Sequence, residues 1–330
     1  MSGGSINLNV LSLTHVIPSQ GVMRYAVASL GDEVFVSCHN SQDIEVYDAG
    51  SFTLQCHITV PGLGSQCYGL AACISNNCLY ASDYENSGIH RVDLSGGSAV
   101  IKWSVASRPA GLSLNKTHNV VVTCCQANKL LEYTTHGTLV REISLEETGL
   151  TSPWHAVQLS TGHYVVCHCT YPGVVSVVGV DGQVVRRYRQ LRPSKVGQMN
   201  SPRSLAVTKN NEIVVGDTGN NRILSMNSSL SSIQALALSV DGGIQQPWGL
   251  CLDESRGRLY VTEYGGGRVL VFENKDVRGR PQYTRTRVSA GQSTAHVRTA
   301  PQCDIDRLIL EHNEVDDDSD YSDDGWAYSN

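Results

Sequence analysis

The chain has 330 residues, of which 41% are apolar and 6% aromatic, and its formal net charge is −6. That charge lies entirely in residues 281–330, which hold 4 basic and 10 acidic residues, whereas residues 1–280 are neutral. A neutral body gives no general attraction to nucleic acid, and no long apolar run or secretory leader is visible. We therefore expect a cytoplasmic, monomeric protein with no membrane contact and no cofactor, whose eleven cysteines are free thiols.

The first predicted strand lies within residues 6–17, where apolar and polar residues alternate from Ile6 to Leu13. Alternation with a period of two is typical of a strand that buries one face. This segment resembles none of the repeats that follow it, so its place in the fold depends on how those repeats end.

Six similar units follow at intervals of 42–49 residues. Each starts with a short apolar strand, often led by proline, and continues with a run of β-branched residues, a polar turn and a third strand. A period of about 40–50 residues with several short strands predicts an all-β fold, namely a six-bladed β-propeller with four-stranded antiparallel blades. The propeller should cover residues 1–280, with blades that begin near residues 23, 66, 108, 152, 201 and 246.

The sixth unit ends after its third strand at residues 268–272, where a polar, arginine-rich stretch begins. We expect residues 6–17 to supply the missing outer strand of the last blade. Closing the ring in this way removes two exposed sheet edges. A frayed N-terminal arm is the alternative.

The fifth unit has the most distinctive pattern. It runs from Pro202 through an apolar strand to a second strand that ends in Asp217, and Arg222 begins the third strand. This pattern resembles an NHL repeat, and the sixth unit, with Glu263 and Arg268, is similar. The resemblance covers residues 20–275 and is weaker where other residues take the acidic position: Cys38, Cys124 and His168.

The resemblance implies a propeller like those of tripartite-motif proteins, where such domains bind partner proteins or RNA. The ring-finger, B-box and coiled-coil segments of those proteins are not found in this sequence. We therefore expect no ubiquitin-ligase activity from this chain alone, and the fold by itself does not fix a function.

The acidic residue at the end of the second strand has a structural explanation. Its carboxylate can accept backbone N–H groups of the turn or pair with the arginine that opens the third strand. Asp217 with Arg222 and Glu263 with Arg268 are therefore predicted structural turn pairs rather than catalytic groups.

A candidate binding face lies where the first strands begin. In antiparallel blades, the start of the first strand and the turn after the second strand lie at the same face. The residues that should ring the channel mouth there include aromatic side chains and an arginine, which are typical of binding hot spots and base-stacking platforms. The predicted face comprises Tyr25, Tyr68, Trp154, His155, Arg203 and Trp248. The alternative is that these side chains pack against neighbouring turns.

The longest interval between units holds a dense basic run within residues 186–195. It could form a patch for phosphates or an acidic peptide. Neighbouring residues of a strand point to opposite sides, so not all of its cations can converge, and a solvated outer strand is the alternative. The candidate patch consists of Arg186, Arg187, Arg189, Arg192 and Lys195.

Enzymatic chemistry has little support in the sequence. Cysteines and a histidine occur at the matching turns 124–125 and 167–169, but their spacing fits no usual zinc module. His155 is the one inner-strand candidate for a channel metal of the kind that propeller lactonases and lyases use. No nucleophile elbow, phosphate loop or paired-carboxylate motif is found. We expect no metal site, and a metal-dependent hydrolase or lyase is the least favoured function.

Residues 281–330 are predicted to be a linker followed by a disordered acidic tail. The simple interpretation is a solubilising segment. The sharper hypothesis is an acidic motif, tuned by phosphorylation at Ser319 or Ser322, that binds the 186–195 stretch of the same chain and competes with RNA.

These patterns favour a non-enzymatic interaction module, acting in substrate recognition or as a scaffold through its aromatic face. A protein or peptide partner is preferred because the body is neutral. RNA binding in post-transcriptional regulation, through the arginine and aromatic residues of the same face, is the alternative.

Overall fold

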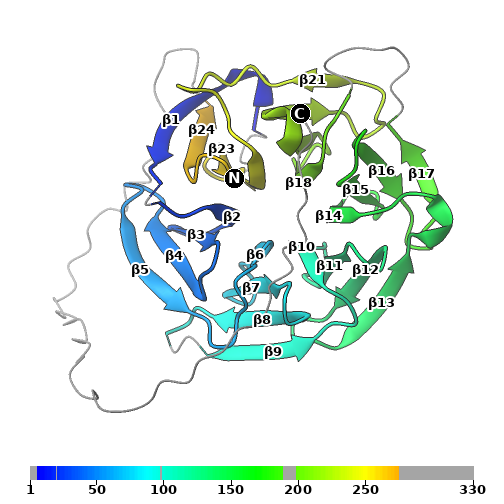
Figure 1. The fold of residues 1–330 in the computed structure, drawn as a ribbon, viewed down its shortest axis with the longest axis horizontal. Helices are drawn as coiled ribbons and strands as arrows, with labels where there is room; N and C mark the ends of the chain where they lie inside the picture. The colour runs from blue at the N-terminus through cyan, green and yellow to red at the C-terminus, as the bar shows by residue number, and fades with distance from the viewer. Residues whose placement is uncertain (1–5, 20, 97–98, 189–197, 275–330) are drawn as a thin grey trace, which may run out of the picture. The chain divides into compact units, whose positions relative to one another are not determined.

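The computed structural model describes residues 6–19, 21–96, 99–188 and 198–274. They form six four-stranded antiparallel sheets arranged as blades around a central axis, as the sequence predicts (Figure 1). In blades 1 to 5 the strands run outward in chain order. The linker and acidic tail that the sequence predicts at residues 281–330 lie outside the described residues.

The strands of blades 1 to 3 have the following bounds: β2 (Arg24–Leu30), β3 (Glu33–Cys38), β4 (Asp43–Asp48) and β5 (Leu54–Thr59); β6 (Leu70–Cys73), β7 (Cys78–Asp83), β8 (Gly88–Asp93) and β9 (Val100–Ser104); β10 (Pro109–Leu114), β11 (Val120–Cys124), β12 (Lys129–Tyr133) and β13 (Leu139–Ser144). Those of blades 4 to 6 are β14 (Pro153–Gln158), β15 (Tyr164–His168), β16 (Val174–Val178) and β17 (Val184–Arg187); β18 (Pro202–Val207), β19 (Ile213–Asp217), β20 (Arg222–Met226) and β21 (Ile233–Ala235); β22 (Pro247–Asp253), β23 (Arg258–Glu263), β24 (Val269–Asn274) and β1 (Leu11–Ile17). Three short 3-10 turns complete the elements: η1 (Leu8–Val10), η2 (Glu146–Thr148) and η3 (Thr218–Asn220).

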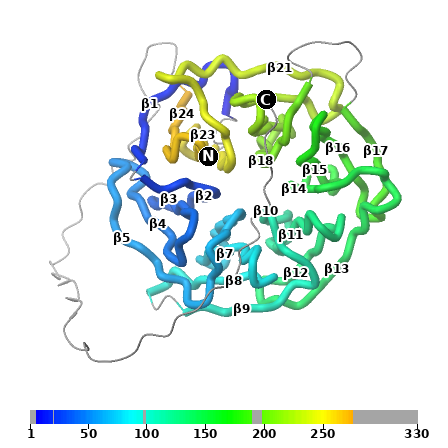
Figure 2. Tube along the Cα trace, viewed as in Figure 1, coloured from blue at the N-terminus to red at the C-terminus, as the bar shows by residue number. Residues whose placement is uncertain are grey.

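The N-terminal strand closes the ring, and the prediction is confirmed (Figure 2). β1 pairs antiparallel with β24, from Leu11 opposite Asn274 to Ile17 opposite Val269, with one irregularity between Leu13 and His15. Blade 6 therefore combines the two ends of the described chain, and its strand order is β22, β23, β24, β1.

The second strand of each blade is the most deeply buried. All residues of β7, β11, β15, β19 and β23 are buried, because each strand lies between two neighbouring strands and two neighbouring blades. This explains why those runs are almost continuously apolar or β-branched. The outermost strands β5, β9 and β13 are largely exposed.

Small residues let the innermost strands approach one another around the axis. A Cβ added at Gly69 would lie 2.8 Å from the carbonyl oxygen of Ala110 in the next blade. One added at Gly249 would lie 2.5 Å from the carbonyl oxygen of Tyr25, across the closing seam. Any side chain there would force the blades apart.

A repeated hydroxyl contact joins blades near the axis. Ser82 Oγ accepts from the backbone N–H of Gly69 in its own blade and donates to the carbonyl of Ala110 in the next, at 2.8 and 3.1 Å. Thr262 does the same at the closing seam, accepting from Gly249 and donating to the carbonyl of Tyr25. The inner strands are thus held in a fixed register, which gives the residues at their starts a fixed geometry.

None of the helical segments in the described part of the chain is long or apolar enough to cross a bilayer.

Candidate functional site

The structure brings five of the predicted face residues together at one end of the central channel: Tyr25, Tyr68, Trp154, Arg203 and Trp248, which we call the aromatic mouth. Each occupies the same place in its repeat, within the first residues of the innermost strand or, for Tyr68, just before it, and in blade 3 that place holds the small Ala110. The ring centroids of Tyr25 and Tyr68 lie 4.7 Å apart, and those of Tyr68 and Trp154 lie 5.5 Å apart. Trp248 is 5.2 Å from Tyr25 and 5.9 Å from Trp154, so four rings from four blades contact one another.

Much of the aromatic surface is used in this mutual packing. Tyr25 is 2% exposed and Trp248 7%, whereas Tyr68 and Trp154 are half-buried. Tilted and edge-to-face pairs of this kind add stability beyond the area that they bury. The mouth is therefore a preformed aromatic floor with two partly accessible rings, rather than a loose set of exposed side chains.

Arg203 supplies the charge of the aromatic mouth. Its guanidinium carbon lies 4.4 Å from the ring centroid of Trp154 and 4.0 Å from that of Trp248, so the cation is held between two indoles. Among the described residues, no carboxylate lies within ion-pair distance of it. A half-buried arginine that is held by aromatic rings and not neutralised can accept an anionic group from outside.

A second layer of side chains surrounds the mouth, at the first position after each second strand. Tyr264 stacks on Tyr25 at 5.6 Å and contacts Trp248 at 4.9 Å, while Tyr84 lies 4.9 Å from Tyr68. The hydroxyl of Tyr25 lies 2.5 Å from Nδ1 of His39.

The sequence predicted that these turns surround the mouth but singled out none of the three side chains. The missed signal is that the residue directly after the second strand is aromatic or histidine in three blades. The exposed Arg108 adds a second cation, 5.4 Å from the ring of Tyr84.

Burial keeps the titratable groups around Arg203 neutral. It raises the pKa of Tyr25 well above its ordinary range and raises the pKa of Tyr68 to about 12. Burial also lowers the pKa of His39. At neutral pH the phenols of Tyr25 and Tyr68 are therefore un-ionised and His39 is uncharged, so none of these three groups neutralises the two arginines.

His155, also predicted for the face, lies deeper and has a structural role. Its Nε2–H donates to the carbonyl of Leu112 in blade 3, and its Nδ1 accepts from the N–H of Leu205 in blade 5, both at 3.0 Å. These partners fix the neutral tautomer, and burial lowers the pKa of the ring. Both ring nitrogens are occupied, so His155 connects three blades and has no free nitrogen for a ligand.

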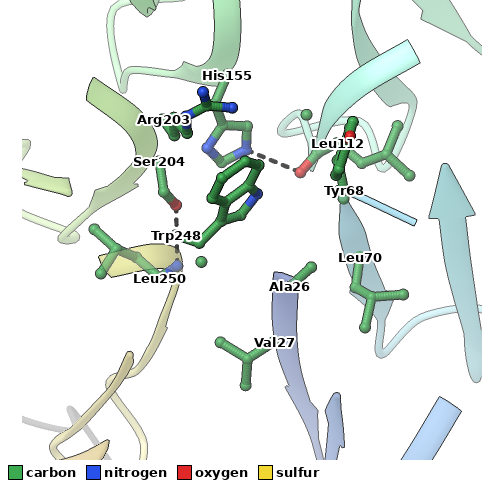
Figure 3. A pocket seen from close by; sticks show the side chains of 13 residues that line it. Ala26, Val27, Tyr68, Leu70, Leu112, His155, Arg203, Ser204, Trp248 and Leu250 are labelled. Carbon is green, nitrogen blue, oxygen red and sulfur yellow. Dashed lines mark hydrogen bonds between the residues drawn. The ribbon is translucent and has the colours of Figure 1, made fainter. Parts of the chain in front are cut away.

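A small cavity of about 30 Å³ lies under the aromatic mouth, between the innermost strands (Figure 3). Arg203, Trp248 and Tyr68 line it on the side of the mouth, and His155 lines it from blade 4. Figure 3 shows Ser204 bonded to the backbone nitrogen of Leu250, at 2.9 Å, and His155 bonded to Leu112.

The two predicted turn pairs are present as ion pairs. Arg222 Nε lies 2.7 Å from Asp217, and Arg268 Nε lies 2.6 Å from Glu263. The carboxylates also accept backbone N–H groups just before the first strands of the same blades, from Asn200 and Gln245. In these contacts the acids anchor the start of the innermost strand, and thereby Arg203 and Trp248.

Blades 2 and 4 build the same anchor differently. Asp83 is buried and contacts His90 and Lys102, each at 3.1 Å. Burial raises the pKa of Asp83, but the hydrogen bonds from His90, Asn86 and Lys102 together outweigh it and hold the pKa below its ordinary range. In blade 4 the position holds His168, whose Nδ1–H donates to the carbonyl of Thr151 at 3.1 Å. In blade 4 the side chain of His168 therefore donates to a backbone carbonyl, whereas in blades 5 and 6 the acid at the same position accepts from a backbone N–H.

The predicted basic patch is only partly within the described residues. Arg186 and Arg187 are exposed on β17, the outermost strand of blade 4, opposite Val177 and Ser176. Arg187 donates to the carbonyl of Thr148 at 3.3 Å. Arg189, Arg192 and Lys195 lie outside the described residues. The two placed arginines are on the rim of the propeller and not on its axis.

The described residues contain no group of three or more histidines, cysteines or acidic residues placed to hold a metal ion. The ten cysteines of the described residues are free, and six of them are buried. Cys125 and Cys169 occupy the ring of turn positions around the mouth, and burial raises the pKa of both thiols.

Two stretches of the chain, residues 199–224 and 245–272, match the family model of the NHL repeat. These are the fifth and sixth units, so the last two blades carry NHL repeats, in agreement with the resemblance seen in the sequence. No curated protein matches the sequence significantly.

Several solved structures share the fold. Hydrazine synthase of Kuenenia stuttgartiensis is 14% identical, over 78% of this chain and 97% of that chain, with a TM-score of 0.57. A catalytically inactive virginiamycin B lyase from Staphylococcus aureus with quinupristin is 13% identical, over 81% and 86%, with a TM-score of 0.58. The WD40 propeller domain of Doa1 is 13% identical, over 82% and 99%, with a TM-score of 0.57. At these identities the likeness concerns the fold alone.

Proposed function

We propose that this NHL-repeat propeller is an interaction module that binds a protein or peptide partner at the aromatic mouth. The observation that carries the proposal is Arg203, a cation held between Trp154 and Trp248 with no carboxylate partner among the described residues. Tryptophan, tyrosine and arginine in a preorganised cluster are the residue types that dominate binding energy at protein interfaces. Rigid side chains also lose little conformational entropy when a partner binds.

The test compares two substitutions at opposite ends of one strand. Arg203→Gln removes the charge at the start of β18, while Lys209→Gln removes a charge just beyond its other end. Lys209 is a fair control because its side chain is 62% exposed and makes only a long contact of 3.8 Å with Glu254. The propeller places the two positions at opposite faces.

Protein and RNA captured from lysate by the wild type would be identified, and the affinity of the purified partner measured by calorimetry. Arg203→Gln is expected to weaken binding by about 2 kcal/mol or more, roughly 30-fold, as for a central hot spot. Lys209→Gln should bind like the wild type. Equal binding by all three proteins, with circular dichroism unchanged, would show that the partner does not use the aromatic mouth.

RNA is the second candidate ligand, because Arg186 and Arg187 are exposed and form no ion pair within the described part of the chain. Salt separates the two candidates. RNA held by several phosphate contacts should lose affinity steeply and linearly on a logarithmic salt scale, whereas a peptide held by aromatic contacts should lose little. A metal-dependent lyase or hydrolase is not proposed, since both ring nitrogens of His155 are already bonded to backbone.

A further inference from the structure

Two buried N–H donors at the base of the aromatic mouth have no acceptor among the described residues: Nε of Arg203 and Nε1 of Trp248. Both side chains line the same cavity, and the guanidinium carbon lies 4.0 Å from the indole centroid. Trp248 is 7% exposed, so its N–H cannot rely on bulk water. Leaving a buried donor without an acceptor costs free energy, and native proteins rarely do so without a reason.

None of the neighbouring polar groups among the described residues is placed to accept from either nitrogen. The hydroxyl of Tyr68 points to Gln66, to which it donates at 2.9 Å, and that of Tyr25 is hydrogen-bonded to His39. Ser204 Oγ accepts from Leu250, and both nitrogens of His155 contact backbone. The site therefore has an excess of donors and one positive charge.

We propose that this cavity binds a single carboxylate group of the peptide partner, which accepts from Arg203 Nε and Trp248 Nε1 at the same time. The inference rests on the proposed function and names the chemical group that the aromatic mouth recognises. An ionised carboxylate supplies two oxygen acceptors and neutralises the arginine, and charge-assisted hydrogen bonds of this kind are the strong ones.

A carboxylate fits the proposed peptide partner, because an unmodified peptide presents its negative charges as carboxylates. The planar group offers two acceptor oxygens, one for each N–H that has no acceptor among the described residues. The same chemistry can come from an acidic side chain or from the terminal carboxylate of a peptide.

The first experiment uses acetate, the smallest carboxylate, and the full chain labelled with ¹⁵N. The indole N–H resonance of Trp248 is assigned by its loss in Trp248→Phe. Adding sodium acetate is expected to move this resonance downfield in a saturable way, while sodium chloride at the same ionic strength does not. The shift should disappear in Arg203→Gln and persist in Lys209→Gln. Absence of an acetate-specific shift, or an equal shift in Arg203→Gln, would overturn the inference and leave bound water as the acceptor.

The second experiment identifies the source of the carboxylate with three short peptides of otherwise equal sequence. One has an internal glutamate and an amidated end, one has glutamine and a free terminal carboxylate, and one has glutamine and an amidated end. One of the first two should bind at least about tenfold more tightly than the third, the effect of one buried charge-assisted contact. Equal binding of all three would contradict carboxylate recognition.

The two proposals fail in different ways. If Arg203→Gln loses the captured partner but acetate leaves the Trp248 resonance unmoved, the mouth binds its partner without recognising a carboxylate. If acetate shifts the indole N–H resonance of Trp248 but Arg203→Gln captures the partner as well as the wild type does, the anion site exists and the partner binds elsewhere.

Discussion

His168 shows how one side chain can make the stability of a blade depend on pH. It is buried, donates from Nδ1 to the carbonyl of Thr151 and accepts at Nε2 from the hydroxyl of Ser176 at 3.0 Å. The contact with Ser176 requires the neutral ring, because a protonated Nε2 can no longer accept from the hydroxyl, whereas the Nδ1–H donor to Thr151 is kept in either state. Burial, with a smaller contribution from Arg187, lowers its pKa to about 4. A folded-state pKa below the unfolded value means that protonation favours unfolding.

The stability that depends on neutral His168 should be fully present above about pH 6.5 and lost as the pH falls toward about 4. Over that window the free energy of unfolding should fall by about 3 kcal/mol more in the wild type than in His168→Gln, which cannot titrate. Urea denaturation of both proteins at several pH values measures this difference, and the subtraction removes the contribution of other groups. Parallel pH profiles would show that His168 is protonated equally in both states.

At the level of single residues, the sequence predicted where side chains lie in the fold better than it predicted which other side chains they contact. The repeat placed Tyr25, Tyr68, Trp154 and Trp248 at one mouth, because each stands at the same place in its unit. It could not show that Tyr25 and Trp248 are buried by the other rings, since that depends on side-chain directions around a closed ring. The sequence also could not show that His155 lies in the wall of the cavity, where both ring nitrogens are hydrogen-bonded to the backbone of two other blades.

At the level of elements, the closing strand β1 carries a direct prediction. Deleting residues 6–17 exposes the edge of β24 and the apolar residues that pack on β1, so we expect a marked loss of stability and aggregation. Attaching the same residues behind residue 274 through a short turn should restore the fold, because β1 runs antiparallel to β24 and needs only a hairpin there. Thermal melts and size-exclusion chromatography would compare both with a chain truncated at residue 274. A rearranged chain as unstable as the deletion would show that the N-terminal connection itself is required.

The elements were largely predictable because their cause is periodic. Short β-branched runs at a regular spacing indicated six blades, and the alternation at the N-terminus indicated the closing strand. The variation between blades was not predictable from the pattern. Blade 1, for example, has no acid after its second strand, and its buried Arg24 instead pairs with Glu45 of the third strand at 3.0 Å. This ion pair takes the place of the turn pair of blades 5 and 6, but its two residues stand at other positions of the repeat. An alignment of the six units therefore does not reveal it.

At the level of the whole molecule, the charge of the chain is divided between a neutral body and an acidic C-terminal segment. If that segment competes for the cations of the propeller, removing residues 301–330 should strengthen the binding of an acidic ligand at low salt and make its salt dependence steeper, because salt already screens the competing segment in the full chain. The melting temperature should not change, because every strand of the described fold lies before residue 275. Calorimetric titration of the full and truncated chains at two salt concentrations provides the measurement. Unchanged affinity and unchanged salt dependence would rule out competition.

The way the ring is closed also decides how it responds to mechanical force. Leu11 is paired with Asn274, so the chain enters β1 at the same end of the seam at which it leaves β24. Tension applied through the segments before residue 6 and after residue 274 would peel these strands apart, loading one pair of backbone hydrogen bonds at a time. A seam loaded in this order resists far less than one sheared along its length. A pull on both ends would therefore open the propeller at blade 6 first, while the other five blades keep all their strands.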